Sequence, residues 1–124
     1  MALWYFAHSQ EHQAGGEKFM QYLRRTTQHT FLNPFGDQKE DPQEIVNGDL
    51  LKMADCHGLV AWFTMSRTQQ IGTPMEVFYA ARFLGKPVLI WCPPRLAVSP
   101  WLKVHGRVTM SILELVGWLR EVPV

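Results

Sequence analysis

Two short apolar runs enclose a segment with helical signals, and this arrangement restricts the possible folds more than any other feature of the sequence. Residues 59–63 and 88–91 are continuously apolar, as expected of strands that are buried on both faces of a parallel sheet. Between them, the sequence predicts a helix that begins near Thr73, just before a proline, and stops at Gly85. The segment therefore predicts a β-loop-α-β unit, the connection that parallel strands require.

The same alternation of strand-like and helical segments continues through the sequence. Further strands are predicted at residues 2–7, 30–32 and 107–110, and helices at 16–25, from Asp41 to Met53, and after Ser111. Alternating strands and helices are typical of a parallel sheet with right-handed crossovers. We expect an α/β fold, a small doubly wound (flavodoxin- or Rossmann-like) parallel sheet of about five strands with helices on both faces. At 124 residues, the chain is predicted to form one domain, residues 1–124.

The composition argues against several classes of partner. A formal net charge of +1 gives no electrostatic basis for binding nucleic acid or an anionic membrane, and no apolar run approaches the ~20 residues of a membrane span. Cys56 and Cys92 lack C-x-x-C spacing, which favours free thiols in a reducing cytoplasm. The histidines form no H-x-x-x-H pair on a predicted helix, so we expect no metal site.

Glu76 is open to two interpretations. Loops and helix N-termini that follow the strands of an α/β sheet line the ligand crevice, which places Glu76 where a catalytic carboxylate would lie. Thr73-x-x-Glu76 also matches a capping box, with Thr73 as the N-cap, Pro74 at the first helical position and Glu76 bonded back to a backbone N–H. The local sequence supports both interpretations.

Polar residues gather at the predicted carboxyl ends of three strands, as expected around an active-site crevice. They are Tyr5, His8 and Ser9 after the first strand, Asn33 and Asp37 after the second, and Ser66 to Glu76 after the third. No G-x-G-x-x-G, Walker or G-x-S-x-G motif is present, so dinucleotide, P-loop and hydrolase sites lack their signatures.

Asp49 is a second candidate carboxylate. Most aspartates on helices face solvent, and Asp49 fits that interpretation. If its helix instead turns it toward the crevice, Asp49 and Glu76 form a carboxylate pair. Such a pair suits glycosyl transfer, in which one carboxylate attacks the anomeric carbon and the other handles a proton or orients the first.

Several of these segments together resemble a known family. Asp49-Leu50, the strand at residues 59–63, the run Gly72-Thr73-Pro74-Met75-Glu76-Val77 with Tyr79-Ala80, and Gly85-Lys86-Pro87-Val88 are similar to the nucleoside 2-deoxyribosyltransferase family. That superfamily includes the deoxynucleoside 5′-monophosphate N-glycosidases. Residues 5–9 resemble its first strand and loop. The match spans about two-thirds of the chain, and its specific part lies between Gly72 and Pro87.

The resemblance implies a role for each matching residue. Glu76 matches the nucleophile, which attacks C1′ of the deoxyribose and forms a covalent glycosyl-enzyme. Asp49 matches an aspartate that orients the nucleophile or interacts with the nucleobase, and Tyr5 matches a tyrosine near the sugar. Further substrate contacts are expected from Phe6, Ser9, Asn33, Phe35, Gly72, Thr73 and Met75.

The position of Glu76 at a helix N-terminus predicts its charge, and the resemblance implies the substrate and the assembly. The helix macrodipole stabilises a carboxylate at the helix N-terminus by ~0.3–1 kcal/mol, so Glu76 is expected to stay ionised at neutral pH. We expect a deoxynucleoside or nucleotide substrate, no cofactor, and a homodimer or larger homo-oligomer.

The sequence departs from the family pattern at three places. His57 stands where the family often has a second aspartate, for which Asp55 is a possible substitute, and His8 replaces a small residue. Ser9 is followed by Gln10-Glu11-His12 in place of a Ser-x-Arg-Gly-Gly phosphate loop, which favours a free nucleoside as substrate. Gly15-Gly16 at the start of the next helix leaves anion binding by backbone N–H groups as an alternative. The departures leave two alternatives open, a non-catalytic nucleotide-binding module on the same fold and a TIR-like NAD glycohydrolase.

Overall fold

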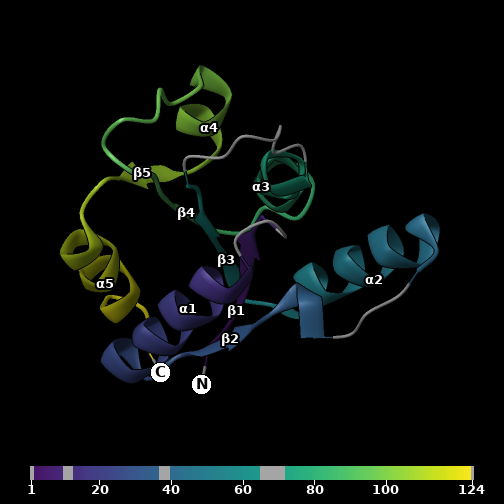
Figure 1. The fold of residues 1–124 in the computed structure, drawn as a ribbon, viewed down its shortest axis with the longest axis horizontal. Coiled ribbons are helices and arrows are strands. Elements are labelled where there is room, and N and C mark those ends of the chain that lie inside the picture. The colour runs from purple at the N-terminus through teal and green to yellow at the C-terminus, as the bar shows by residue number, and fades with distance from the viewer. Residues whose placement is uncertain (1, 10–12, 37–39, 65–71, 124) are drawn as a thin grey trace.

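The computed structural model of the chain describes residues 2–9, 13–36, 40–64 and 72–123 (Figure 1). The elements in chain order are β1 (Leu3–His8), α1 (Gln13–Thr27), β2 (Thr30–Leu32), the 3₁₀ helix η2 (Pro34–Gly36), α2 (Pro42–Asp55), β3 (Gly58–Trp62), α3 (Gly72–Arg82), β4 (Val88–Trp91), α4 (Pro100–His105), β5 (Arg107–Thr109) and α5 (Ile112–Arg120). The predicted positions of all five strands are confirmed, with differences of only a residue at the ends of some. No helix among these residues is long and apolar enough to cross a membrane.

The strands form one parallel sheet in the order β2-β1-β3-β4-β5. This confirms the predicted doubly wound α/β fold and matches the flavodoxin-like strand order. The chain runs from β1 to β2 on one side and then returns to place β3 on the other side of β1. The strand order therefore reverses between β1 and β3, which is where ligands bind in folds of this class.

Helices cover both faces of the sheet, and each face has its own apolar core (Figure 1). One core joins alternate residues of the strands, such as Tyr5 and Ala7, to α2, α3 and α4. The other joins Trp4 and Phe6 to α1 and α5. Because successive side chains of a strand point to opposite faces, neighbouring residues of β1 belong to different cores.

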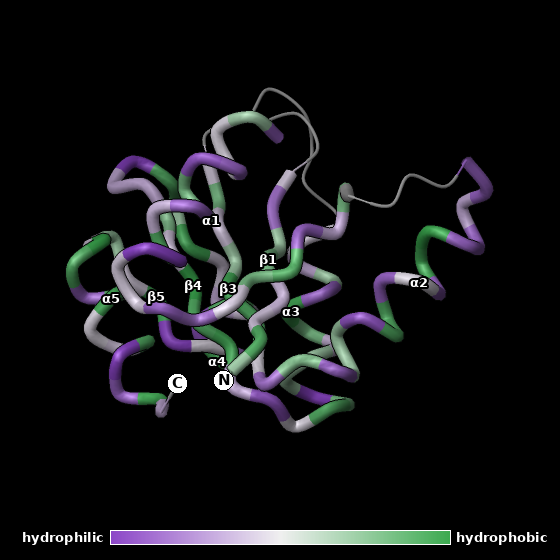
Figure 2. The backbone as a smooth tube through the Cα atoms, turned by 90° about the horizontal axis from the view of Figure 1, so that it is seen from below, coloured by the Kyte–Doolittle hydropathy of each residue, from purple (hydrophilic) through white to green (hydrophobic). Residues whose placement is uncertain are grey.

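Helix α2 is only partly covered. Figures 1 and 2 both show it projecting beyond the strands. Ile45 is 42% exposed and Val46 is 55% exposed, whereas Met53 near its C-terminal end is buried. Only the C-terminal half of α2 therefore packs into the core.

The Gly85-Lys86-Pro87 segment joins α3 to β4 and holds α2 in place. Gly85 has a φ of +64°, a conformation that other residues adopt at a cost. The Lys86 ammonium group donates hydrogen bonds to the backbone carbonyls of Met53, Ala54 and Cys56 at the end of α2. A cation at a helix C-terminus satisfies carbonyls that have no partner within the helix.

Candidate active site

The Tyr5 hydroxyl group and the Glu76 carboxylate meet between β1 and α3. Tyr5 is fully buried and points to the face of the sheet covered by α2, α3 and α4. Its hydroxyl group donates a hydrogen bond to Oε2 of Glu76, 71 residues further along the chain. The fold thus joins the first strand to the helix that follows β3, at the reversal of the strand order.

The surroundings of Glu76 favour its protonated form. Burial raises the pKa of Glu76 to about 8, while the Tyr5 hydrogen bond acts to lower the pKa and the charge of Asp49 acts to raise it. Burial and the Glu76 charge also raise the pKa of Tyr5. The expectation that Glu76 stays ionised at neutral pH is therefore wrong. One pKa unit corresponds to about 1.4 kcal/mol, so the loss of hydration outweighs the ~0.3–1 kcal/mol that a helix dipole supplies.

Asp49 joins this pair from α2. Its side chain is half-buried, and burial raises the pKa of the Asp49 carboxyl, with the charge of Lys52 acting in the opposite direction. Its charge raises the pKa of both Tyr5 and Glu76. An effect of the Asp49 charge on Glu76 agrees with the predicted carboxylate pair, and the role of Asp49 stays a prediction.

The capping-box interpretation is wrong because Thr73 and Glu76 lie further inside the helix than a capping box requires. Helix α3 begins at Gly72, so Thr73 is its second residue and Glu76 its fifth. The first turn of α3 contains no acidic residue, and the Glu76 carboxylate is bonded to Tyr5. In the folded chain, the Glu76 carboxylate therefore binds the Tyr5 hydroxyl group and does not cap the helix.

A second polar group lies at the carboxyl end of β1. His8 is buried, and its Nε2 lies 3.3 Å from Oδ1 of Asn33. That Asn33 oxygen also accepts a hydrogen bond from the Phe35 backbone N–H at 3.1 Å, and the Phe35 ring stands edge-on to His8. The Asn33 amide donates to Oε1 of Glu17 at 3.4 Å. These contacts tie α1 and η2 to the end of β1.

The structure also explains the two glycines near the start of α1. A Cβ atom on Gly16 would come within 2.4 Å of Nδ1 of His8, and one on Gly15 within 3.1 Å of the Trp62 ring. Both positions let α1 approach these two rings closely. Sequence analysis did not single out Gly15, Gly16 or Glu17 as neighbours of His8, because the Gly-Gly pair gives no sign of which ring it faces.

The remaining predicted substrate-binding residues have different placements. Phe6 is fully buried in the core on the other face of the sheet, and Met75 is 65% exposed on α3, so neither side chain joins Glu76. Ser9 follows β1 and is half-buried, Gly72 is exposed at the start of α3, and Thr73 is buried beside it. Asp37 and residues 66–71 lie outside the described residues.

His57, its possible substitute Asp55, and His8 lie at different edges of the sheet. His57 is exposed just before β3, with its ring 5.1 Å from that of Trp4, and belongs to the opposite edge of the sheet. Asp55 is exposed at the end of α2. Neither residue lies near the carboxylate pair, whereas His8 lies at the carboxyl edge.

Within the described part of the chain, no three His, Cys, Asp or Glu side chains group so as to hold a metal ion. Cys56 and Cys92 are both buried free thiols, and burial raises the pKa of each to about 11. The titratable groups gathered at Tyr5, Asp49 and Glu76 are suited to proton handling and to nucleophilic attack by a carboxylate.

Comparison with solved structures supports the fold. The chain superposes on a 2-desoxiribosyltransferase from Leishmania mexicana with a TM-score of 0.77 and 19% identity, covering all of both chains. It superposes on a 2-deoxyribosyltransferase from the psychrotolerant bacterium Bacillus psychrosaccharolyticus with a TM-score of 0.70 and 14% identity, covering 98% of this chain and 93% of that one. No family model and no curated protein matches the sequence. The resemblance predicted from the Gly72–Pro87 segment thus extends to the fold of the whole chain.

Proposed function

We propose that this chain is an enzyme of the nucleoside 2-deoxyribosyltransferase family, which cleaves or transfers the N-glycosidic bond of 2′-deoxynucleosides. The observation that carries the proposal is the hydrogen bond from Tyr5 to Glu76, beside the charge of Asp49. The predicted nucleophile and the predicted sugar-side tyrosine are in contact although they come from distant parts of the sequence, and the charge of the predicted orienting aspartate acts on both. The fold shared with two 2-deoxyribosyltransferases adds support.

In the first step, the proton that burial favours on Glu76 passes to Asp49, and the resulting Glu76 carboxylate attacks C1′ of the deoxyribose. A bond forms between C1′ and the carboxylate oxygen while the bond between C1′ and the base nitrogen breaks, with both of its electrons leaving on the base. Protonated Asp49 donates a proton to the departing base. Burial raises the pKa of Asp49, which favours its acid form for this purpose.

In the second step, an acceptor attacks C1′ and releases Glu76. A second nucleobase gives transfer and a water molecule gives hydrolysis, and in either case the acceptor's proton passes to Asp49. The Tyr5 hydroxyl group holds Oε2 in place by its hydrogen bond, so the other oxygen, Oε1, is the one we assign to attack. Two displacements at one carbon retain the configuration of the sugar.

We propose a free nucleoside, without a 5′-phosphate, as the preferred substrate. Phosphates bind at helix N-termini where the backbone can approach them closely. At α1, the space beside Gly16 is taken by the His8 ring, and burial lowers the pKa of His8, which favours the neutral imidazole. The nearby Glu17 carboxylate, bonded to Asn33, adds a negative charge.

We further propose that the enzyme works as a homo-oligomer in the cytoplasm. The support for assembly is the set of large apolar side chains that are more than half exposed, which are Val46, Leu51, Met75, Phe83, Trp101, Val104, Met110 and Leu113. The support for the compartment is the pair of free thiols.

The test is chromatography of the purified protein after incubation with each 2′-deoxynucleoside and each 5′-monophosphate, with and without a second free base. We expect free base from hydrolysis or a new nucleoside from transfer. Glu76→Gln should lower the rate about 1,000-fold, because removing a nucleophile abolishes the covalent route. Glu44→Gln, which alters an exposed glutamate of α2, is the matched control and should keep full activity.

Three other outcomes would contradict the proposal in different ways. Tight nucleoside binding without turnover, unchanged in Glu76→Gln, would indicate the non-catalytic binding module. Nicotinamide release from NAD would indicate the TIR-like glycohydrolase. Faster turnover of monophosphates than of nucleosides would support the glycosidic activity but overturn the free nucleoside as the preferred substrate.

A further inference from the structure

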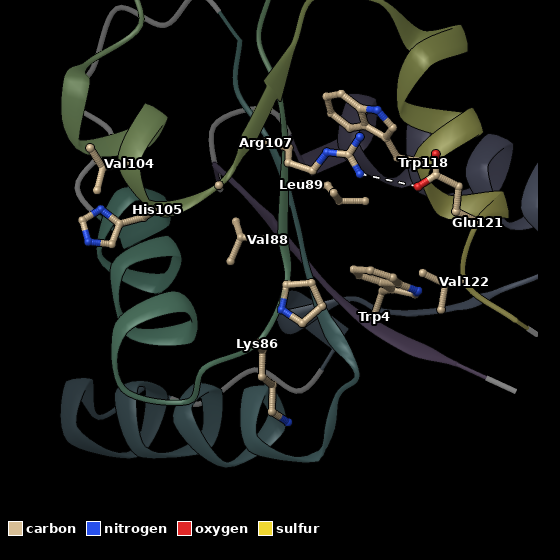
Figure 3. A pocket seen from close by; sticks show the side chains of 12 residues that line it. Trp4, Lys86, Val88, Leu89, Val104, His105, Arg107, Trp118, Glu121 and Val122 are labelled. Carbon is tan, nitrogen blue, oxygen red and sulfur yellow. Dashed lines mark ion pairs between the residues drawn. The ribbon is translucent and has the colours of Figure 1, made fainter.

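A cavity lies at the opposite edge of the sheet from Glu76. It has a volume of about 370 Å³ and opens between the amino ends of β4 and β5 and the C-terminal end of α5 (Figure 3). This volume is within the range of small-molecule sites, roughly 300–1,000 Å³. Glu76 lies in the helix that follows the carboxyl end of β3, so the cavity does not belong to the proposed active site.

The walls of this edge cavity are mainly apolar and aromatic. Val88 and Leu89 are buried in β4, Pro87 and Val122 line the sides, and Trp4 and Trp118 complete the lining. Apolar walls of this kind favour an apolar ring as the ligand.

The polar groups around the cavity differ in whether they are free to bind a ligand. Lys86 is committed to the backbone carbonyls at the end of α2. Both nitrogens of His105 are engaged, Nδ1 with the Trp101 carbonyl at 2.6 Å and Nε2 with the Arg82 guanidinium at 3.0 Å. These two residues therefore contribute little polar recognition.

Arg107 is the available cation. Its guanidinium carbon lies 4.2 Å from the centre of the Trp118 ring and covers that side of the indole. Its Nη1 lies 3.6 Å from Oε2 of Glu121, a distance too long for a good hydrogen bond, and both side chains are more than half exposed. A carboxylate on a ligand can pair with Arg107 in two parallel hydrogen bonds, which Glu121 does not achieve here.

Trp4 supplies an unused donor. The side chain is 1% exposed, and its Nε1 has no hydrogen-bond partner among the described residues. Figure 3 shows this nitrogen turned toward Val122, with both residues lining the cavity. A buried donor without a partner is unfavourable, and an acceptor atom on a ligand would satisfy it.

We propose that the edge cavity binds a small carboxylate whose apolar ring carries a hydrogen-bond acceptor. The ring packs against the apolar walls formed by Pro87, Val88 and Val122, the carboxylate pairs with Arg107, and an acceptor at the edge of the ring receives the Trp4 N–H. A single cation beside Glu121 suits one negative charge better than the two of a phosphate, because Glu121 repels the second. The site is independent of the proposed glycosidic activity.

The probe is cinchoninate, a quinoline whose ring nitrogen and carboxylate lie on opposite edges. Binding is followed by NMR through the indole N–H signals of the ¹⁵N-labelled protein, with the Trp4 signal assigned from Trp4→Phe. We expect saturable binding that shifts the Trp4 signal. The uncharged cinchoninamide and the naphthalene analogue without a ring nitrogen should each bind about five- to tenfold more weakly.

Two variants give opposite predictions. Arg107→Gln should weaken cinchoninate binding about tenfold, whereas Glu121→Gln should strengthen it about three- to tenfold because the competing carboxylate is removed. Both residues are exposed, so neither change threatens folding. Arg120→Gln is the matched control, since the guanidinium group of Arg120 donates to the Thr26 carbonyl and Arg120 does not line the cavity.

The proposal is overturned by any of three results. These are no saturable binding at millimolar probe, equal affinity for the acid and its amide, or weaker binding in Glu121→Gln. A probe that binds without moving the Trp4 signal would overturn the assignment of that donor. None of these results bears on Glu76.

Discussion

At the level of single residues, the protonation of Glu76 connects the chemistry of the site to the stability of the fold. The folded chain holds the Glu76 proton up to a pKa of about 8, compared with the ordinary pKa of 4.5. The stability that depends on Glu76 is therefore fully present below about pH 4.5 and is lost as the pH rises through about 8. A neutral carboxyl is thus the form that the folded site favours.

Glu76→Gln is predicted to stabilise the protein in alkaline solution. The amide stays neutral, so the free energy of unfolding should exceed that of wild type by about 1–3 kcal/mol near pH 9 and by little near pH 5. Urea unfolding at the two pH values measures the difference, with Glu44→Gln as the control. An equal difference at both pH values would show that Glu76 is not protonated in the folded site.

Tyr5 and Asp49 are predicted to shift the Glu76 pKa in opposite directions. Tyr5→Phe removes the hydrogen bond that lowers this pKa, so the Glu76 pKa should rise above about 8. Asp49→Asn removes the charge that raises it, so the pKa should fall. Carbon NMR titration of the glutamate carboxyls, with Glu76 assigned from Glu76→Gln, follows both changes. Shifts of the same sign in the two variants would contradict the arrangement described above.

At the level of helices and their connections, the position of α3 depends on how it ends. Gly85→Ala should destabilise the protein by about 1 kcal/mol, because alanine is strained at a φ of +64°. Gly117→Ala is the matched comparison, since Gly117 lies inside α5 with open space around it, and should stabilise by about 0.5–1 kcal/mol. Thermal unfolding of both variants tests the contrast, and destabilisation by both would argue against it.

Lys86 is predicted to hold the end of α2 through its ammonium group. Lys86→Met keeps most of the apolar stem but removes the donors to the three carbonyls, which should cost about 1–3 kcal/mol. Chemical unfolding measures this loss, and Lys103→Met, a change at an exposed residue of α4, serves as the control. Amide exchange should also quicken in the last turn of α2. Unchanged amide exchange in the last turn of α2 would show that Lys86 stabilises the protein through other contacts.

At the level of the whole molecule, the sheet separates two groups of polar residues. The Tyr5–Glu76–Asp49 group lies on one face toward the reversal of the strand order, and the edge cavity lies at the amino ends of β4 and β5. The two groups share no residue. Binding at one edge therefore has no direct contact with chemistry at the other.

This separation predicts that changes at the two places are additive. The effects of Glu76→Gln and Arg107→Gln on the free energy of unfolding should sum in the double variant to within about 0.5 kcal/mol. Urea unfolding of the two single variants and the double variant measures the coupling. A coupling well above that value would mean that the sheet transmits strain between its edges.

The sequence alone determined the fold class and the positions of the strands. Apolar runs such as Val88–Trp91 and the stop at Gly85 are local signals, because burial on both faces and a left-handed backbone each select particular residue types. The motif around Glu76 also singled out that residue before any contact was known.

Only the tertiary structure decided which side chains meet and in what state. From the sequence, Asp49 fitted a solvent-exposed helix face equally well, whereas in the structure its charge acts on Glu76. The Phe6 side chain packs in the core on the opposite face of the sheet from Tyr5. The sequence predicted an ionised Glu76, whereas burial in the folded chain favours the protonated form. A local pattern indicates the helix dipole but not the loss of hydration that packing causes. The edge cavity likewise joins Trp4 to Arg107, residues that only the order of the strands brings together.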